Sequence, residues 1–424
     1  MSDLVIKGGT VVDATGSRTA DVAIAAGRIV AVGDDLSGDR TLDAGGCFVT
    51  PGLVDLHAHL RQPGNEEAET VESASRAAVL GGFTAVLAMP NTTPAIDSAS
   101  VVREVQTLGE ASLCDIEVAG TITVGRNGEQ LSPMGEMADL GVKVFTDNGQ
   151  GLQDDRLMRR AMEYAGGLGV TLAQHPENES LSEGGHMHEG AMSSVLGIPG
   201  IPAEAEELMV MRDVTLCRLT GAKVHFQHLS TAGSIGIVSA AKNSGLSITA
   251  EIAPHHFTLT DRCVESYDSL YKVNPPLRTA QDVAAVRLAL ADSVVDAITS
   301  DHAPHEPHLK ELPFDEAPCG MIGLETALAL AMTELDMDIG ALLALLSWQP
   351  AAIAGIEHCH GGPIAPGRPA NIAVIDPAAT WVVSGREMAS RSSNTPYEGR
   401  ELTGRVRHTI VHGEPMVIDG EAQR

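Results

Sequence analysis

Positive charge is scarce in this sequence. Its 424 residues include 28 Lys and Arg against 56 Asp and Glu, which leaves a net charge of -28 at pH 7. A nucleic-acid surface needs clustered basic side chains that neutralise phosphates, so we expect neither DNA nor RNA as a partner. The acidic residues are scattered rather than grouped in blocks, which is typical of a solvated surface.

Cysteines and long apolar runs are also few. The six cysteines lie far apart and form no CxxC pair, which indicates reduced thiols. They are Cys47, Cys114, Cys217, Cys263, Cys319 and Cys359. No apolar run reaches the length of about 18 residues that a membrane span needs. The start "MSDLVIKGGTVVDATG" lacks the basic segment and apolar core of a signal peptide, so we expect a cytoplasmic protein that does not contact a membrane.

The two ends of the chain have the same sequence pattern of short strands and turns. Residues 1–50 alternate short strand-like runs with Gly and Asp turns. Residues 360–424 continue in the same way, with "ANIAVIDP", "TWVVSG" and "RHTIVHGEPMVIDG". We therefore expect residues 1–50 and 360–424 to pair into one small composite β domain.

Residues 51–359 follow a different pattern, in which apolar runs alternate with helical stretches. With 43% hydrophobic residues the chain can bury a large core. Helices are expected at 69–81, 97–110, 154–167, 203–219, 234–244 and 280–292. The runs are residues 53–59, "GGFTAVLAMP", "IEVAGTITV", "VKVFTD", "VTLAQH", "KVHFQH", "SITAEIAP" and "VDAITSD". Eight strands interleaved with helices predict an α/β fold, a parallel (β/α)8 TIM-type barrel. A doubly wound sheet is less favoured because no GxGxxG follows the first strand.

Polar side chains stand where the predicted strands end, which is where such barrels build their active sites. In "VDLHAHLRQPG", His57 and His59 are two residues apart and therefore point to one face of a strand. The other strand-end residues are Asn91, residues 143–148, His175, His228 and Asp301. Imidazole and carboxylate together suit Zn²⁺ or a related divalent ion, and the lack of paired cysteines favours a catalytic site.

Each of these residues has a simpler interpretation when taken alone. A single strand histidine such as His175 is most often a hydrogen-bonded core residue, and Asp301 could cap a helix. Arg61 could form a surface salt bridge. Their joint occurrence at the same point of successive strands favours the metal site.

Several motifs together resemble the dihydroorotases of the amidohydrolase superfamily, in their bacterial single-chain form. They are "PGLVDLHAHLRQPG", "AMPNT", "YKVNPPLR", "SDHAPH" and "GMIGLETAL". The HxH pair is shared with hydantoinases and allantoinases, whereas the LR after it, MPNT, NPPLR and DHAPH are more specific. The similarity runs nearly end to end.

The resemblance implies the reversible hydrolysis of L-dihydroorotate to N-carbamoyl-L-aspartate in pyrimidine biosynthesis, with one or two zinc ions. His57, His59 and Asp301 would hold one metal, and His175 and His228 a second. The implied substrate contacts are Arg61, Asn91 and His305 on the carboxylate, Asn274 against the ring, and the backbone of Cys319 and Gly320 at its polar edge. A metal supplies hydroxide at neutral pH, and Asp301 would shuttle the proton to the departing ring nitrogen. The resemblance also implies a homodimer and leaves association with aspartate transcarbamoylase open.

One position departs from the family pattern. Where the family reads DDG, with a second aspartate that bridges two metals, this chain reads "DNG" with Asn148. Lys143 falls where hydantoinases and animal dihydroorotases carry a carboxylated lysine, so a carbamate there would restore the missing anion. Three alternatives stay open: two metals bridged by a Lys143 carbamate, a single metal on His57, His59 and Asp301, or a weakly active relative. The "QHP" at 174–176, where the family commonly has HC, is a smaller departure.

Two rival functions come from different classes. Another cyclic amidase, a hydantoinase or an allantoinase, would not need the cluster of Arg61, Asn91 and His305, because its substrate lacks the ring carboxylate. A non-catalytic scaffold that binds aspartate transcarbamoylase would have no use for four strand-end histidines and Asp301.

Overall fold

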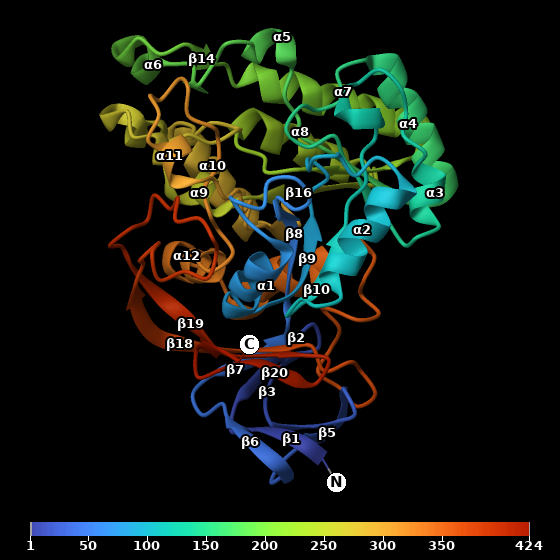
Figure 1. The fold of residues 1–424 in the computed structure, drawn as a ribbon, viewed down its shortest axis with the longest axis vertical. Helices are drawn as coiled ribbons and strands as arrows, with labels where there is room; N and C mark the ends of the chain where they lie inside the picture. Colours follow the sequence, from blue (N-terminus) through green and yellow to red (C-terminus); the bar gives the residue numbers. More distant parts are fainter. Residues whose placement is uncertain (1, 424) are drawn as a thin grey trace.

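Eight parallel strands lie near the middle of the molecule, with helices above and around them (Figure 1). The structure is a computed structural model, and it describes residues 2–423. They are β8 (Leu53–Ala58), β9 (Phe83–Ala88), β10 (Asp115–Val118), β11 (Val144–Phe145), β12 (Thr171–Gln174), β15 (Lys223–Phe226), β16 (Ile248–Ile252) and β17 (Ala297–Ile298). Neighbouring strands pair in the order β10-β9-β8 and β11-β12-β15-β16-β17. Parallel bridges between Gly120 and Phe145 and between Ala58 and His302 join the two groups. The strands therefore close into the predicted barrel.

The six predicted helices are confirmed and lie between the strands. They are α1 (Val71–Leu80), α2 (Ala99–Gly109), α4 (Asp155–Leu168), α7 (Glu204–Thr220), α8 (Ala232–Asn243) and α10 (Ala280–Ala291). Local chemistry sets their ends: the Thr70 side chain caps α1, Asp154 caps α4, and Gly169 ends α4 in the left-handed conformation. None of the helices within residues 2–423 is long and apolar enough to cross a membrane.

Shorter elements fill the loops around the barrel. Along the chain they are η1 (Val124–Arg126), α3 (Met134–Ala138), α5 (Glu179–Ser182), β13 (Met187–His188), α6 (Ala191–Leu196), β14 (Gly200–Ile201), α9 (Pro254–Thr258), η2 (Asp261–Ser266), η3 (Ser269–Tyr271), α11 (Pro307–Lys310), α12 (Ala327–Glu334), α13 (Ile339–Leu343), η4 (Ala344–Trp348) and α14 (Gln349–Ala354). The largest apolar cluster lies between strands and helices, where Phe145, Leu172 and Phe226 of the strands meet Val210 of α7. This packing holds the strand ends in place around the site.

The two ends of the chain pair in a small β domain below the barrel (Figure 1). Its seven-stranded sheet has the order β21-β20-β19-β18-β7-β2-β3, and its four-stranded sheet has the order β5-β4-β1-β6. The bounds are β1 (Ser2–Lys7), β2 (Thr10–Asp13), β3 (Gly16–Thr19), β4 (Asp21–Ala25), β5 (Arg28–Gly33), β6 (Gly38–Asp43), β7 (Phe48–Pro51), β18 (Ile372–Val382), β19 (Glu401–Val411), β20 (Glu414–Ile418) and β21 (Glu421–Ala422).

The composite β domain is thus confirmed by the pairing of β7 with β18, in which Pro51 lies opposite Ile372. Because β7 ends at Pro51 and β8 begins at Leu53, the β domain leads directly into the first barrel strand. The domain limits at residues 50 and 360 stay a prediction.

Candidate active site

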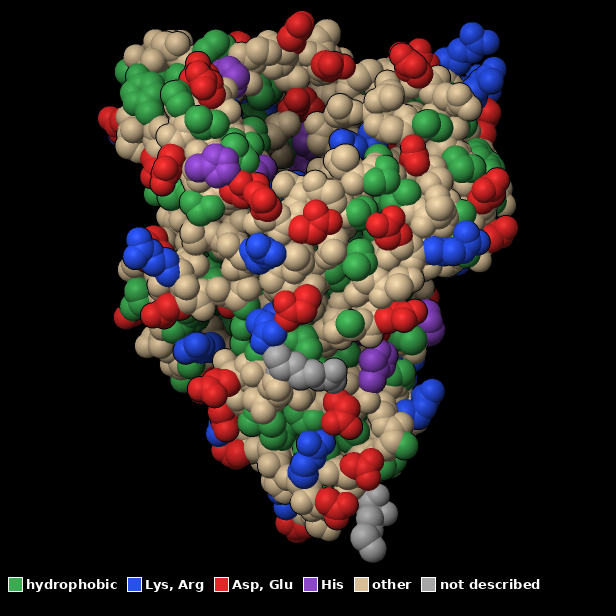
Figure 2. Space-filling model, viewed as in Figure 1, with side chains coloured by type: hydrophobic (Ala, Val, Ile, Leu, Met, Phe, Trp, Pro, Cys, Tyr) green, Lys and Arg blue, Asp and Glu red, His purple; other side chains and the backbone are tan. Residues whose placement is uncertain are grey.

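A cavity of about 310 Å³ opens at the carboxyl ends of the barrel strands. Eleven of the twelve predicted site residues line it: His57, His59, Arg61, Asn91, His175, His228, Asn274, Asp301, His305, Cys319 and Gly320. Asn148, Gly149, Val273 and Ala303 complete the wall. Figure 2 shows a hollow in the upper part of the molecule with histidine side chains inside it, and acidic side chains scattered over the surrounding surface.

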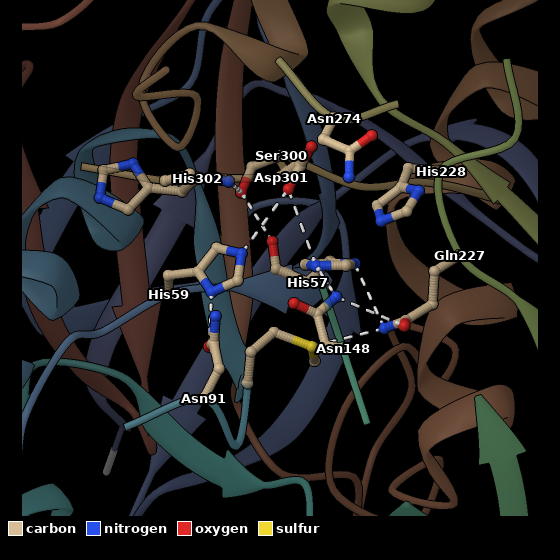
Figure 3. A network of polar contacts seen from close by, with 12 residues as sticks. His57, His59, Asn91, Asn148, Gln227, His228, Asn274, Ser300, Asp301 and His302 are labelled. Atoms are coloured by element: carbon tan, nitrogen blue, oxygen red, sulfur yellow. Dashed lines mark hydrogen bonds and ion pairs between the residues drawn. The ribbon is translucent and has the colours of Figure 1, made fainter. Parts of the chain in front are cut away.

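Two imidazoles and one carboxylate converge on one point of this cavity. The potential ligand atoms of His57, His59 and Asp301 all lie within 4.8 Å of one another. Asp301 Oδ1 is 3.7 Å from His57 Nε2 and 3.9 Å from His59 Nε2 (Figure 3). Two nitrogens and one oxygen in this arrangement fit a single divalent cation with open coordination positions.

The second ring nitrogen of each of these histidines is already bonded. His57 Nδ1 donates to Glu251 Oε1 at 2.8 Å, and His59 Nδ1 lies 2.8 Å from Asn91 Oδ1. Burial would raise the pKa of Glu251, but hydrogen bonds from His225 and His57 outweigh it and hold that pKa at about 2. Glu251 is therefore an anion that fixes the His57 tautomer with the proton on Nδ1, so that Nε2, which accepts from Asn148 Nδ2 at 2.8 Å, is the ring nitrogen that could bind a metal.

The two residues that precede Asp301 are anchored by hydrogen bonds to Asp55, and this fixes the position of Asp301. Thr299 Oγ1 and Ser300 N both donate to Asp55 Oδ1, at 2.7 and 2.8 Å. Burial raises the pKa of Asp301 to about 7, although His57 opposes the shift. Its φ of 45° lies in the left-handed region, which a non-glycine residue rarely adopts and which is common at functional sites.

His175 and His228 form a pair beside this centre. His175 Nδ1 lies 3.0 Å from His228 Nε2, both rings are buried, and burial holds the pKa of each imidazole below its usual value. His228 Nδ1 is buried without a hydrogen-bond partner. Among residues 2–423 no carboxylate joins this pair in a cluster of metal-ligand geometry. Asn148 lies close by, and its Nδ2 donates to Gln227 Oε1 at 3.4 Å.

Lys143 is the one predicted site residue that lies elsewhere, and the prediction of a carbamate at this site is wrong. Lys143 directly precedes β11 and Asn148 follows it, so the two residues stand at opposite ends of the barrel. Five residues of extended chain span roughly 16 Å. Lys143 is exposed and lines a separate hollow together with Lys223 and Gly355. The alternative with two metals bridged by Lys143 is therefore excluded.

Arg61, which lines the cavity, is a cation whose guanidinium has fewer hydrogen-bond partners than it could bind. Arg61 donates from Nε to Pro304 O at 3.0 Å, and its Nη2 lies 3.3 Å from His305 Nε2. Burial lowers the pKa of Arg61 to about 10, so the side chain stays charged near neutral pH. Within residues 2–423, no acidic side chain forms an ion pair with this guanidinium, and Nη1 has no hydrogen-bond partner.

Cys319 and Gly320 form part of the same wall, but their backbone groups are largely committed. Cys319 O lies 2.8 Å from His305 Nε2, and Gly320 N donates to Lys272 O at 2.9 Å. Gly320 has a φ of +135°, and a Cβ there would lie 2.6 Å from Ala303 Cβ. Glycine is therefore required at this position, and it keeps the wall open.

Three functional residues were missed by the sequence reasoning. Glu251 and Gln227 contact His57 Nδ1, and His255 Nε2 lies 3.6 Å from Asp301 Oδ2 without a hydrogen-bond partner. A usable signal existed for Glu251, because a charged residue inside the apolar run "SITAEIAP" has to be paired when that strand is buried. His255 follows the end of the same strand.

Comparisons with known proteins give a consistent result. Residues 46–234 match the family described as Dihydro-orotase-like. The chain is 46% identical to the dihydroorotase of Pelotomaculum thermopropionicum over 425 residues, which covers 98% of this chain and 99% of the relative. It is also 46% identical to the dihydroorotase of Streptomyces coelicolor over 430 residues, with 99% and 100% covered.

Among solved structures the fold is similar to that of hydantoinases. The L-hydantoinase of Arthrobacter aurescens superposes with a TM-score of 0.90 at 24% identity, covering 100% of this chain and 98% of that one. The D-hydantoinase of a Thermus species gives a TM-score of 0.85 at 25% identity, covering 99% and 96%. This likeness concerns the barrel and its attached β domain.

Proposed function

The chain belongs to the dihydroorotase family, a family of metal-dependent cyclic amidohydrolases, and from this premise we propose how its cavity hydrolyses L-dihydroorotate reversibly to N-carbamoyl-L-aspartate. One observation carries the proposal. The cavity that brings His57, His59 and Asp301 together also holds the incompletely paired Arg61. A metal site and a carboxylate site thus lie within reach of one small molecule.

A single Zn²⁺ is the cofactor that these residues fit, on His57, His59 and Asp301. Two imidazole nitrogens and a carboxylate oxygen are the usual donors of a catalytic zinc. When bound, the metal would polarise the ring carbonyl and lower the pKa of water. His175 and His228 would hold a second metal poorly, because the neutral Asn148 stands where the family has a bridging carboxylate and Lys143 lies at the other end of the barrel.

Asp301 is the proposed proton carrier of the reaction. Its carboxylate faces the centre of the cavity and has His57, His59 and His255 around it. From there it can take the proton of the attacking water and pass it to the ring nitrogen as the amide bond breaks. In the reverse direction the same group would take the proton from the carbamoyl nitrogen.

Arg61 and Asn274 are the proposed anchors of the substrate. The open Nη1 of Arg61 would bind the ring carboxylate, because a guanidinium offers a fork of donors to two oxygens, and His305 and Asn91 would border that group. Asn274 Oδ1 is buried without a partner and would accept a ring N–H. The side chain of Asn91 has a second role, since its oxygen orients His59.

The test compares two substrates with the zinc-loaded enzyme. We expect turnover of L-dihydroorotate and much slower turnover of dihydrouracil, which has the same cyclic amide but lacks the carboxylate. Equal kcat/KM values for the two would favour a hydantoinase activity and remove the role of Arg61.

The assembly of the enzyme is a separate proposal that rests on the family resemblance. We propose a homodimer, and leave aspartate transcarbamoylase as a candidate partner. Sedimentation of the chain alone and with that enzyme would test both assignments.

A further inference from the structure

A second hollow of about 360 Å³ lies at the opposite end of the barrel from the active site. It is bounded by α14, by the first residues of β12, β15 and β16, and by the residue that precedes β11. Its lining is Lys143, Gly169, Thr171, Lys223, Val224, Leu246, Ser247, Ile248, Thr249, Ala352, Ile353 and Gly355. The lining thus combines two ammonium groups, several hydroxyls and an apolar wall.

The two lysines of this hollow differ from the other four in the chain. Each of the others has a partner: Lys7 and Lys242 pair with carboxylates, and Lys272 and Lys310 donate to backbone carbonyls. Over residues 2–423, no hydrogen bond or ion pair is formed by the ammonium of Lys143 or Lys223. In a protein with a net charge of -28, two unpaired cations that line one hollow form a local site of opposite sign.

A chain of hydrogen bonds, buried beyond its first member, connects this hollow with the active site. Thr249, in the hollow, bonds through Oγ1 to His225 Nδ1 at 2.8 Å. His225 Nε2 donates to Glu251 Oε2 at 3.0 Å, and Glu251 Oε1 accepts from His57 Nδ1 at 2.8 Å. His225 and Glu251 are at most 2% exposed, so the chain runs through the barrel interior.

Strand β15 makes the same connection through its side-chain alternation. Lys223, His225 and Gln227 are two residues apart and therefore share one face of the strand. Lys223 stands at the hollow, and Gln227 Nε2 lies 3.3 Å from His57 Nδ1 (Figure 3).

We propose that this hollow binds a small phosphorylated molecule with an apolar or planar body, and that its occupancy is transmitted to His57 through Thr249, His225 and Glu251. The two ammoniums would bind the phosphate as point charges. Leu246 and Ile353, which are partly exposed in the hollow, would cover the body. A phosphate oxygen that accepts a hydrogen bond from the Thr249 hydroxyl would turn this hydroxyl away from His225. The hydrogen bonds from His225 to Glu251 and from His57 to Glu251 would then rearrange.

The binding test uses phenyl phosphate as the probe and calorimetry of the full-length, zinc-loaded protein. We expect one saturable site, and binding that is at least about tenfold weaker in the Lys143→Met, Lys223→Met double variant, since charge-assisted contacts are lost. Lys7→Met is the matched control, because it removes a partly exposed ammonium of the β domain that does not line the hollow, and it should bind as the unmodified protein does. Unchanged affinity in the double variant would overturn the site.

Three further arms define the ligand class. Inorganic phosphate should bind more weakly than phenyl phosphate, because it lacks the apolar body. Benzoate should also bind more weakly than phenyl phosphate. Equal binding of benzoate would overturn the assignment of a phosphorylated ligand and indicate a carboxylate ligand instead. Saturating dihydroorotate should change the affinity for the probe by no more than the coupling factor seen in the kinetics, because coupling between two binding sites is reciprocal. Complete, competitive displacement by dihydroorotate would place the probe in the catalytic cavity and overturn the proposal.

The transmission is tested by kinetics in the presence of the probe. Saturating phenyl phosphate should change kcat/KM for dihydroorotate about fivefold or more, the usual size of coupling between sites. Thr249→Val, which keeps the side-chain shape, should still bind the probe and lose this effect. Binding without any kinetic change in the unmodified protein would overturn the transmission to His57. The heat of binding does not depend on turnover, so a failure of the binding proposal can be distinguished from a failure of the proposed catalytic function.

Discussion

Asn148 Nδ2 donates to His57 Nε2 at 2.8 Å, so the amide occupies the ring nitrogen that faces Asp301 (Figure 3). A carboxamide carries no charge and cannot bridge two cations. We predict that Asn148→Asp raises the zinc content from one toward two ions per chain, because the new carboxylate would contact His57 in the cavity that His175 and His228 also line. Asn148→Ala is the control and should stay at one ion. Elemental analysis of the purified variants would decide, and an unchanged content in Asn148→Asp would contradict the account.

The exchange of Asp301 for asparagine tests the proton carrier. Asp301→Asn keeps a ligand oxygen but cannot carry a proton, so kcat should fall by about 10² to 10⁴, the usual contribution of general acid–base catalysis. Zinc content and thermal unfolding are measured alongside, to separate lost chemistry from lost metal or lost fold. A variant that keeps its zinc and more than about a tenth of kcat, a barrier change of only about 1.4 kcal/mol, would show that another group moves the proton.

Arg61→Lys tests the carboxylate anchor. One ammonium cannot reproduce the fork of a guanidinium, so kcat/KM for dihydroorotate should fall by about tenfold to a hundredfold. The slow turnover of dihydrouracil should change little, because that substrate has no carboxylate. Steady-state kinetics on both substrates give the comparison, and equal losses on the two would indicate a general disturbance of the cavity instead.

Glu325, from the "GMIGLETAL" motif, should make stability depend on pH. Burial raises its pKa to about 7 in the folded protein, although backbone N–H groups of Ala389 and Ser390 oppose the shift. In the unfolded chain its pKa returns to the ordinary glutamate value of 4.5. Between these values the folded state binds more protons, so the free energy of unfolding falls as pH rises from about 4.5 to about 7.

Glu325→Gln should therefore stabilise the protein by about 2 kcal/mol above pH of about 7, and by little near pH of about 4.5. Denaturant unfolding at both pH values measures the difference. Glu136→Gln, which changes an exposed carboxylate, is the control and should have little effect at either pH. A stabilisation that does not grow with pH would contradict the assignment.

The fold was predictable because its two halves carry different local patterns. Apolar runs that alternate with helices are compatible with only a few architectures, and the parallel barrel is one of them. The β-rich ends do not follow this alternation, so they were assigned to a separate domain. The predicted helix at 154–167 matches α4 at 155–168 because Asp154 and Gly169 mark its ends in the sequence. Closure itself depends on contacts such as that of Ala58 with His302, which are remote in sequence.

The sequence predicted the place of the site residues that follow a strand. The prediction failed for Lys143, which precedes a strand. His57, His59, His175, His228 and Asp301 all stand at carboxyl ends, so the barrel geometry brought them together. Lys143 failed because β11 is only two residues long, and its limits decide which end of the barrel a nearby residue joins. The partners of the ligands, such as Glu251, are fixed by packing between strands.

Metal titration of the chelated protein tests the central claim most directly. The account predicts that the metal-free enzyme does not hydrolyse L-dihydroorotate, and that activity returns in proportion to added Zn²⁺ and saturates at one equivalent per chain. The matched experiment with His59→Ala should show neither tight zinc binding nor recovery. Full activity without metal would contradict the account, and so would recovery that begins only after a second equivalent.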